Sequence, residues 1–139
     1  MILPILLSLL FFVLGLIHLS WVFGGKFGFE ASLPTKENGE RVLNPKKLDS
    51  AVVGLGLMVF GLFYLSKSGI IDYDLPSIIL NYGSWIIPAI FILRAIGEFK
   101  YVGFFKRVRQ TKFGKLDTLF FSPLCLVIGI LGILIKLMH

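Results

Sequence analysis

The stretch that decides the fold is residues 77–109, SIILNYGSWIIPAIFIL followed by RAIGEFKYVGFFKRVR. Its first 17 residues carry no charge, whereas the next 16 contain five Lys or Arg residues and one Glu. A helix needs about 17–25 mainly apolar residues to cross the hydrocarbon core of a bilayer. The stretch therefore predicts a membrane-spanning helix that ends in a basic segment. The aromatic residues among the bases are typical of a segment at the membrane surface.

Three further blocks of the chain are apolar over similar lengths. They cover residues 2–24, 50–66 and 119–138, and Lys136 is the one charged residue within them. The whole chain of 139 residues is 56% hydrophobic and 16% charged, with a mean hydropathy of +0.88. Soluble domains carry about 25% charged residues. The sequence therefore predicts a multi-pass membrane protein.

The four blocks predict a single transmembrane domain over residues 1–139. The connections between them are too short to hold a separate soluble domain, and the longest runs from Lys26 to Asp49. Short connections place consecutive helices side by side and antiparallel. We therefore expect an all-α, four-helix, up-down bundle, with helices over about residues 2–24, 48–66, 77–99 and 118–138.

The basic residues are distributed unevenly among the connections. Eleven Lys or Arg residues lie in the first and third connections, against two, Lys67 and Lys136, on the opposite side. Cytoplasmic loops of membrane proteins are enriched in Lys and Arg, so we expect both basic loops in the cytoplasm and both termini outside. We interpret Lys106, Arg107 and Arg109 as part of this topological signal. Anionic lipid headgroups are the expected partners of these bases, and the net charge of +6 does not indicate nucleic acid.

The sequence indicates neither a metal site nor a cofactor. The single cysteine, Cys125, lies inside the fourth apolar block, and the two histidines, His18 and His139, lie near opposite ends of the chain. A Cys or His cluster with metal-ligand spacing is therefore not expected. The GGKFG stretch at residues 24–28 does not match a P-loop or a dinucleotide-binding turn.

Five polar side chains are expected near one membrane surface, at the cytoplasmic ends of the helices. They are His18, Asp49, Arg94, Glu98 and Asp117. Helix dipoles favour cations near C-termini and anions near N-termini, which explains all of them except Glu98. Arg94 is also close enough to its helix end to reach the headgroups. Two interpretations of Glu98 stay open: it pairs with Arg94, four residues earlier, or it belongs to a functional site.

His18 is the other residue with two open interpretations. It shares a helix face with Trp21, three residues later, and it either packs beside an interfacial Trp or carries protons. In the second case, a carboxylate near the same membrane surface would act with it in acid–base chemistry. The candidate catalytic residues are therefore His18, Glu98 and Asp117, and the candidate ligand-binding residues are Trp21, Arg94 and Tyr101.

Three functions fit these observations. The favoured one is binding of a lipid-like or other amphipathic small molecule in a polar cavity at the cytoplasmic face, with acid–base catalysis as its sharper version. The alternative is a noncatalytic accessory or scaffold subunit whose basic loops dock anionic lipids or a partner protein. A small transporter or channel comes third, because the middles of the apolar blocks hold no ionisable residue. The sequence does not decide whether the protein is an enzyme, and it does not indicate an oligomer.

The same polar positions belong to motifs that resemble a known family. The motifs are HLSWVFGG (residues 18–25), LP (33–34), RVLNP (41–45), RAIGEFKYVGFFKR (94–107), DT (117–118) and SPLC (122–125). They are similar to a family of small bacterial membrane proteins, the domain-of-unknown-function family 3995, over essentially the whole chain. The resemblance implies four transmembrane helices in a bacterial cytoplasmic membrane, and it implies no activity.

Overall fold

The computed structural model describes residues 2–25, 29, 33, 36, 38, 40, 47–69, 75–97, 99 and 101–138, and all regular structure among them is helical. The elements are α1 (Ile2–Val22), α2 (Lys47–Ser68), α3 (Ser77–Ile96), α4 (Lys112–Leu116), the π-helical segment η2 (Asp117–Phe121) and α5 (Ser122–Met138). Because α4, η2 and α5 are continuous, the described residues form four rods, each long and apolar enough to cross a membrane. This confirms the predicted all-α class and the number of membrane-length helices.

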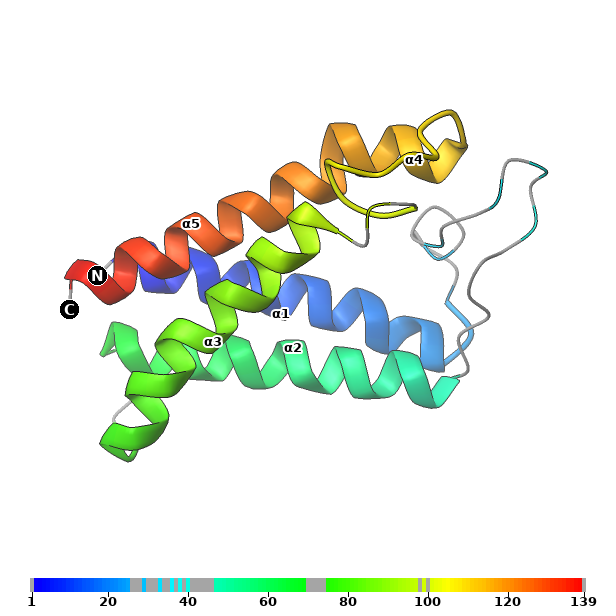
Figure 1. Ribbon diagram of the computed structural model, residues 1–139. Coiled ribbons are helices and arrows are strands. Elements are labelled where there is room, and N and C mark those ends of the chain that lie inside the picture. Colours follow the sequence, from blue (N-terminus) through cyan, green and yellow to red (C-terminus); the bar gives the residue numbers. More distant parts are fainter. Residues whose placement is uncertain are drawn as a thin grey trace.

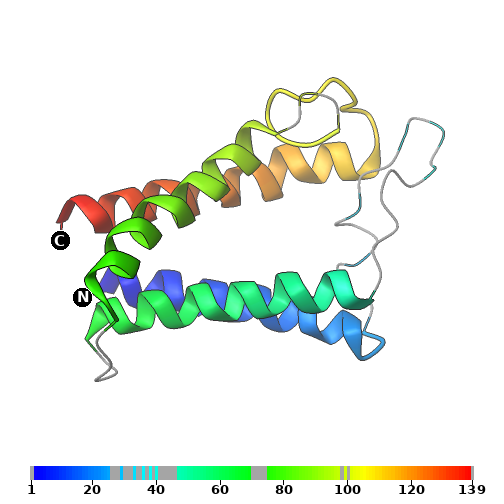
Figure 2. The ribbon, with the colours of Figure 1, turned by 60° about the horizontal axis from the view of Figure 1, so that its bottom comes forward.

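The four rods form two helix pairs. α1 packs along α2, α3 packs along α5, and α1 also touches α5. Figures 1 and 2 show the pairs close together at the end that holds both chain termini, and farther apart at the end that holds α4. The chain therefore runs up and down through the four rods, and consecutive rods are joined at alternate ends.

Apolar side chains cover the outside of every rod. Exposed examples are Leu9, Val13 and Leu16 of α1, Val52, Leu55 and Val59 of α2, Ile79, Ile86 and Leu93 of α3, and Val127, Ile130 and Leu134 of α5. Soluble monomers rarely expose apolar surface of this extent. In a bilayer, lipid tails cover such a surface, and helices satisfy their own backbone hydrogen bonds.

An aromatic cluster joins the two pairs. Phe11 of α1 lies 5.8 Å from Tyr64 of α2 and 5.3 Å from Phe91 of α3, measured between ring centroids. Phe11 and Tyr64 are 0% and 1% exposed, and Ile128 of α5 belongs to the same buried core. Aromatic pairs at such distances contribute about 0.5–1.5 kcal/mol each beyond the burial of their area. This cluster therefore fixes one pair against the other.

Small residues let α1 and α2 approach each other closely. A Cβ built on Gly54 would lie 2.8 Å from the Leu19 side chain and 3.2 Å from the Gly15 carbonyl oxygen. In membrane helices, glycines at such positions bring backbones together so that van der Waals packing can hold them. The buried Ser8 hydroxyl adds a hydrogen bond to the Gly61 carbonyl at 2.9 Å.

Gly54→Leu is expected to destabilise the α1–α2 pair by about 1–3 kcal/mol, because overpacking a close interface displaces its neighbours. Gly56→Leu is the matched control on the same helix, since a Cβ at Gly56 would meet no atom within 4 Å. Thermal unfolding in a mild detergent should show a lower midpoint for Gly54→Leu than for Gly56→Leu. Equal midpoints would contradict the close packing.

Two helix ends differ from those expected. α3 ends at Ile96 rather than near residue 99, because Gly97 has a φ of 87° and breaks the helix. The last rod begins at Lys112 rather than near residue 118. Thr111 caps it there by accepting a hydrogen bond from the Gly114 N–H at 2.9 Å. Asp117 consequently lies beyond the first turn of this rod.

Candidate functional site

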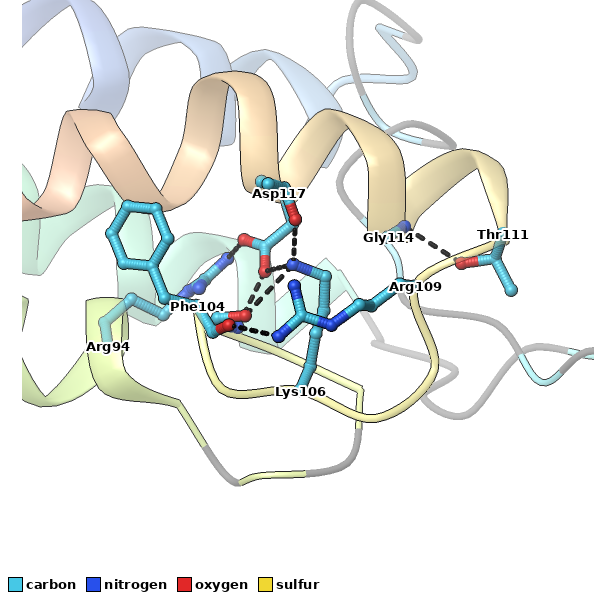
Figure 3. A network of polar contacts seen from close by, with 9 residues as sticks. Arg94, Phe104, Lys106, Arg109, Thr111, Gly114 and Asp117 are labelled. Atoms are coloured by element: carbon cyan, nitrogen blue, oxygen red, sulfur yellow. Dashed lines mark hydrogen bonds and ion pairs between the residues drawn. The ribbon is translucent and has the colours of Figure 1, made fainter.

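The α4 end of the molecule contains a buried carboxylate surrounded by donors. Asp117 is 0% exposed, and its Oδ1 accepts a hydrogen bond from Arg94 Nη2 at 2.9 Å. Its Oδ2 accepts one from the Gly103 N–H at 2.6 Å and lies 3.2 Å from Lys106 Nζ. Figure 3 shows Arg94 and Lys106 reaching Asp117 from the end of α3 and from the loop that follows it. Both carboxylate oxygens are therefore engaged.

Lys106 is a buried cation whose ammonium N–H groups all have acceptors. Its side chain is 0% exposed. Besides pairing with Asp117, its Nζ donates to the Gly103 carbonyl at 3.0 Å and to the Thr118 hydroxyl. An ammonium group has three N–H donors, so these three acceptors use all of them. Such complete pairing is needed because taking an ion out of water costs several kcal/mol.

The loop between α3 and α4 folds back onto the end of α3. Gly97 and Gly103 have φ values of 87° and 91°, which residues with a Cβ rarely adopt. The Phe104 N–H donates to the Ala95 carbonyl at 2.7 Å. A Cβ on Gly103 would lie 2.3 Å from the Ile96 carbonyl oxygen. The two glycines therefore allow a backbone-to-backbone contact that carries Gly103 and Lys106 to Asp117.

Arg94 carries the part of the site whose hydrogen bonds are incomplete. Its Nη2 is bound to Asp117, but its Nη1 is buried and has no hydrogen-bond partner among the described residues. The Ser122 hydroxyl is buried beside the Asp117 carboxylate. Buried polar atoms without a partner are rare and costly. The Arg94 side chain as a whole is 32% exposed, whereas its Nη1 is not, so a ligand that contacts the exposed part of the side chain would reach Nη1 only after a local shift of the side chains around it.

The cluster has an excess of positive charge. Arg94 and Lys106 bring two positive charges and Asp117 brings one negative charge, which leaves one positive charge over. Within the part of the chain that the structure describes, no further ion pair joins these three side chains. Because charges interact more strongly away from bulk water, this excess favours an anion at the site.

The helix is widened where the cluster lies. In η2, the Ser122 N–H donates to the carbonyl of Asp117, five residues earlier. π-helical turns are rare, occur mostly as single turns inside α-helices, and are frequent at functional sites. The widened turn begins at Asp117 itself and is followed by Ser122, whose hydroxyl is buried beside the Asp117 carboxylate. This region is therefore the candidate functional site.

The candidates His18 and Trp21 lie together on α1. His18 Nδ1 is 2.8 Å from the Leu14 carbonyl oxygen, so this nitrogen carries the proton. The His18 and Trp21 ring centroids are 4.5 Å apart. The hydrogen bond and ring contact of His18 both stay within α1, which belongs to the helix pair that diverges from α3 and α5 at this end (Figure 2). The imidazole therefore forms no hydrogen bond or ion pair with Arg94 or Asp117.

The remaining candidates are Glu98, Tyr101 and Asp49. Glu98 lies outside the described residues, so both interpretations of it, the pairing with Arg94 and the role in a functional site, stay predictions. Tyr101 is half-buried in the loop that follows α3, and Asp49 is exposed in the first turn of α2. The structure thus brings Arg94 and Asp117 into direct contact.

Lys106 is the main residue that the sequence interpretation missed. It was expected to act with Arg107 and Arg109 as a topological signal, yet it is buried while they are exposed. Arg94 was expected to extend toward the lipid headgroups, and in the structure its side chain pairs with Asp117. The sequence held one indication that Lys106 has a specific role, because Lys106 lies in the motif over residues 94–107.

Four membrane-length helices, with charged side chains gathered at one end of the second pair, define a small multi-pass membrane protein. Residues 11–132 match the model of the family described as "Protein of unknown function (DUF3995)", and the chain belongs to that family. The resemblance seen in the sequence motifs is confirmed. No curated protein and no solved structure matches the chain.

Proposed function

We propose that this protein binds the anionic headgroup of a lipid-like, amphipathic molecule at Arg94, without catalysing a reaction on it. The observation that carries the proposal is the buried, unpartnered Nη1 of Arg94 in a cluster with one excess positive charge. A phosphate oxygen that reaches Nη1 after a local shift of the surrounding side chains would satisfy both, since guanidinium groups form strong, charge-assisted hydrogen bonds to phosphate. The planar guanidinium presents five N–H donors, so it can hold Asp117 and a phosphate at once.

The surface around the cluster suits a ligand at the membrane interface. Phe99 and Phe105 are 58% and 60% exposed, and their ring centroids lie 6.5 Å apart. Aromatic rings and bases together are typical of segments at headgroup level, and each base near an anionic surface contributes about 1 kcal/mol. Among the described residues of this loop and of α4, the exposed bases are Arg107, Arg109, Lys112 and Lys115.

The geometry favours binding over acid–base catalysis. A general base must lie within hydrogen-bond reach of the proton that it removes. Both Asp117 oxygens are already occupied by donors from the protein. His18 uses Nδ1 within α1 and has no carboxylate partner among the described residues. A headgroup-binding, noncatalytic protein therefore accounts for more of the site than an enzyme does.

The proposed orientation rests on the basic loops. The enrichment of Lys and Arg in cytoplasmic loops would place the Arg94 site at the cytoplasmic surface. The family resemblance favours a bacterial cytoplasmic membrane. The proposed ligand would then be an anionic phospholipid of the inner leaflet, or a molecule with the same headgroup chemistry.

Anionic lipid is expected to stabilise the wild-type protein, and Arg94→Gln is expected to lose most of that effect. A ligand present at 100 times its Kd raises the free energy of unfolding by about 2.7 kcal/mol. Hydrogen bonds to charged groups contribute about 1.5–3 kcal/mol, so losing the Arg94 contact should weaken binding roughly tenfold or more. Thermal unfolding in mild detergent, with phosphatidylglycerol or phosphatidylcholine added, measures the difference.

Two further variants sharpen this experiment. Arg107→Gln is the matched control, because it removes the same charge from an exposed side chain of the same loop. Glu98→Gln tests whether Glu98 supplies the missing negative charge instead. In that case the variant would be less stable without lipid and would gain more from phosphatidylglycerol than the wild type does. Equal stabilisation of the wild type and Arg94→Gln by phosphatidylglycerol would overturn the proposal.

A further inference from the structure

The end of the molecule opposite α4 holds a second group of cations, which the proposed function does not use. Lys67, near the end of α2, donates from Nζ to the Ser84 hydroxyl at 2.9 Å. Lys136, near the end of α5, donates from Nζ to Asn81 Oδ1 at 3.2 Å. Asn81 and Ser84 are three residues apart on α3, so they share one helix face. α3 therefore receives an ammonium group from each of two other helices.

The two ammonium groups have no counter-ion among the described residues. Both of their acceptors are neutral, they lie on one face of α3, and the two like charges repel each other. Helix C-termini favour a nearby cation, which explains each lysine separately but not their convergence on α3. An ammonium group has three N–H donors, so both lysines keep donors for another acceptor. An anion between them would replace repulsion by attraction.

A buried hydroxyl lies one turn deeper on the same helices. Tyr64 precedes Lys67 by three residues, is 1% exposed, and has no hydrogen-bond partner for its Oη in the described part of the chain. This oxygen lies 3.0 Å from the position of a Cβ on Gly132, four residues before Lys136. Residues three and four apart on a helix share a face. The helix faces that present the two lysines therefore also hold an unused hydrogen-bond donor.

We propose that Lys67 and Lys136 together bind one phosphate group, at the membrane surface opposite the Arg94 site. A phosphate offers several anionic oxygens and can accept charge-assisted hydrogen bonds from two ammonium groups at once. The neighbouring apolar residues Ile78, Tyr82 and Leu137 are 62%, 63% and 69% exposed. Acyl chains can therefore lie beside the phosphate, which favours a phospholipid headgroup over a soluble phosphate.

The test is equilibrium binding of fluorescently labelled phosphatidylglycerol to the full-length protein in mild detergent. It is carried out in an Arg94→Gln background, so that the loss of this site is distinguishable from a failure of the Arg94 proposal. Lys67→Gln and Lys136→Gln are each expected to weaken binding about tenfold, as expected for the loss of one charge-assisted contact. Lys67→Arg, which keeps the charge, is expected to retain binding. Lys47→Gln, which removes the charge of an exposed lysine at the start of α2, is the control.

One shared phosphate predicts that the two substitutions are not additive. The loss of affinity in the double variant should be much smaller than the product of the losses in the two single variants, because both lysines act on the same group. Competition by unlabelled phosphatidylglycerol alone would identify a lipid as the source of the phosphate. Competition by inorganic phosphate as well would identify a soluble source. Additive effects, unchanged affinities, or equal competition by phosphatidylcholine would overturn the proposal.

Discussion

Asp117→Asn is expected to lower the free energy of unfolding by about 3–5 kcal/mol, the usual cost of removing one partner of a buried ion pair. The substitution leaves Arg94 and the fully buried Lys106 facing each other without a negative charge between them. Asparagine keeps the size of the side chain, so the loss comes from charge rather than from a cavity. Thermal or denaturant unfolding in mild detergent measures it.

Two comparisons show whether charge is the cause. Asp49→Asn changes an exposed carboxylate in the first turn of α2 and is expected to cost no more than about 1 kcal/mol. The double variant Lys106→Met/Asp117→Asn should recover part of the lost stability. Replacing both partners of a buried ion pair by neutral groups costs little, whereas removing one partner leaves the other charge buried and unpaired. Similar stabilities of Asp117→Asn and Asp49→Asn would contradict the role of Asp117 as a shared counter-ion.

Gly103→Ala should have the second large effect, on the order of 3 kcal/mol, and its cost has two sources. Its φ of 91° is strained for any residue with a Cβ, by about 1–3 kcal/mol. The new Cβ would also lie 2.3 Å from the Ile96 carbonyl oxygen and 2.5 Å from Gly97 Cα. These are backbone atoms that cannot rotate away, so overpacking adds about 1–3 kcal/mol. The Gly103 N–H would move away from Asp117 as well.

Gly24→Ala separates the two sources of that cost. Gly24 also has a φ of 91°, but a Cβ there would meet no atom within 4 Å. It therefore carries the backbone strain alone, and the difference between the two variants reports the clash in the loop. Unfolding midpoints in mild detergent, with circular dichroism to check helix content, give both values. If Gly103→Ala is no less stable than Gly24→Ala, the loop does not pack on α3 as described.

The helices were predictable because the bilayer sets their length and excludes charge. The 17 uncharged residues at 77–93 are sufficient by themselves to predict a membrane-spanning helix. The arrangement of the rods in two pairs was not predictable in the same way. Lipid tails are as apolar as the protein interior, so the inward and outward faces of a rod look alike in sequence. The end of α3 at Gly97 and the start of the last rod after Thr111 depend on capping residues, which a hydropathy pattern does not detect.

The candidate site was predictable in location but not in its contacts. Helix order alone placed Arg94 and Asp117 at one membrane surface. Their pairing spans 23 residues and depends on how the loop folds, whereas the sequence suggested the local partner Glu98. The burial of Lys106 depends on the positive φ of Gly103, which no periodicity reveals. His18 was expected at the same surface as Asp117, but the sequence could not place it in the other helix pair.

If an anionic headgroup neutralises the excess positive charge of Arg94, Lys106 and Asp117, it should stay bound during gentle purification. Native mass spectrometry of the protein extracted in mild detergent tests this most directly, because it weighs the bound molecule. We predict that the wild type and Arg107→Gln retain an anionic phospholipid, and that Arg94→Gln carries one fewer. A wild-type protein without any anionic adduct, or an Arg94→Gln variant with the full wild-type complement, would contradict the Arg94 site.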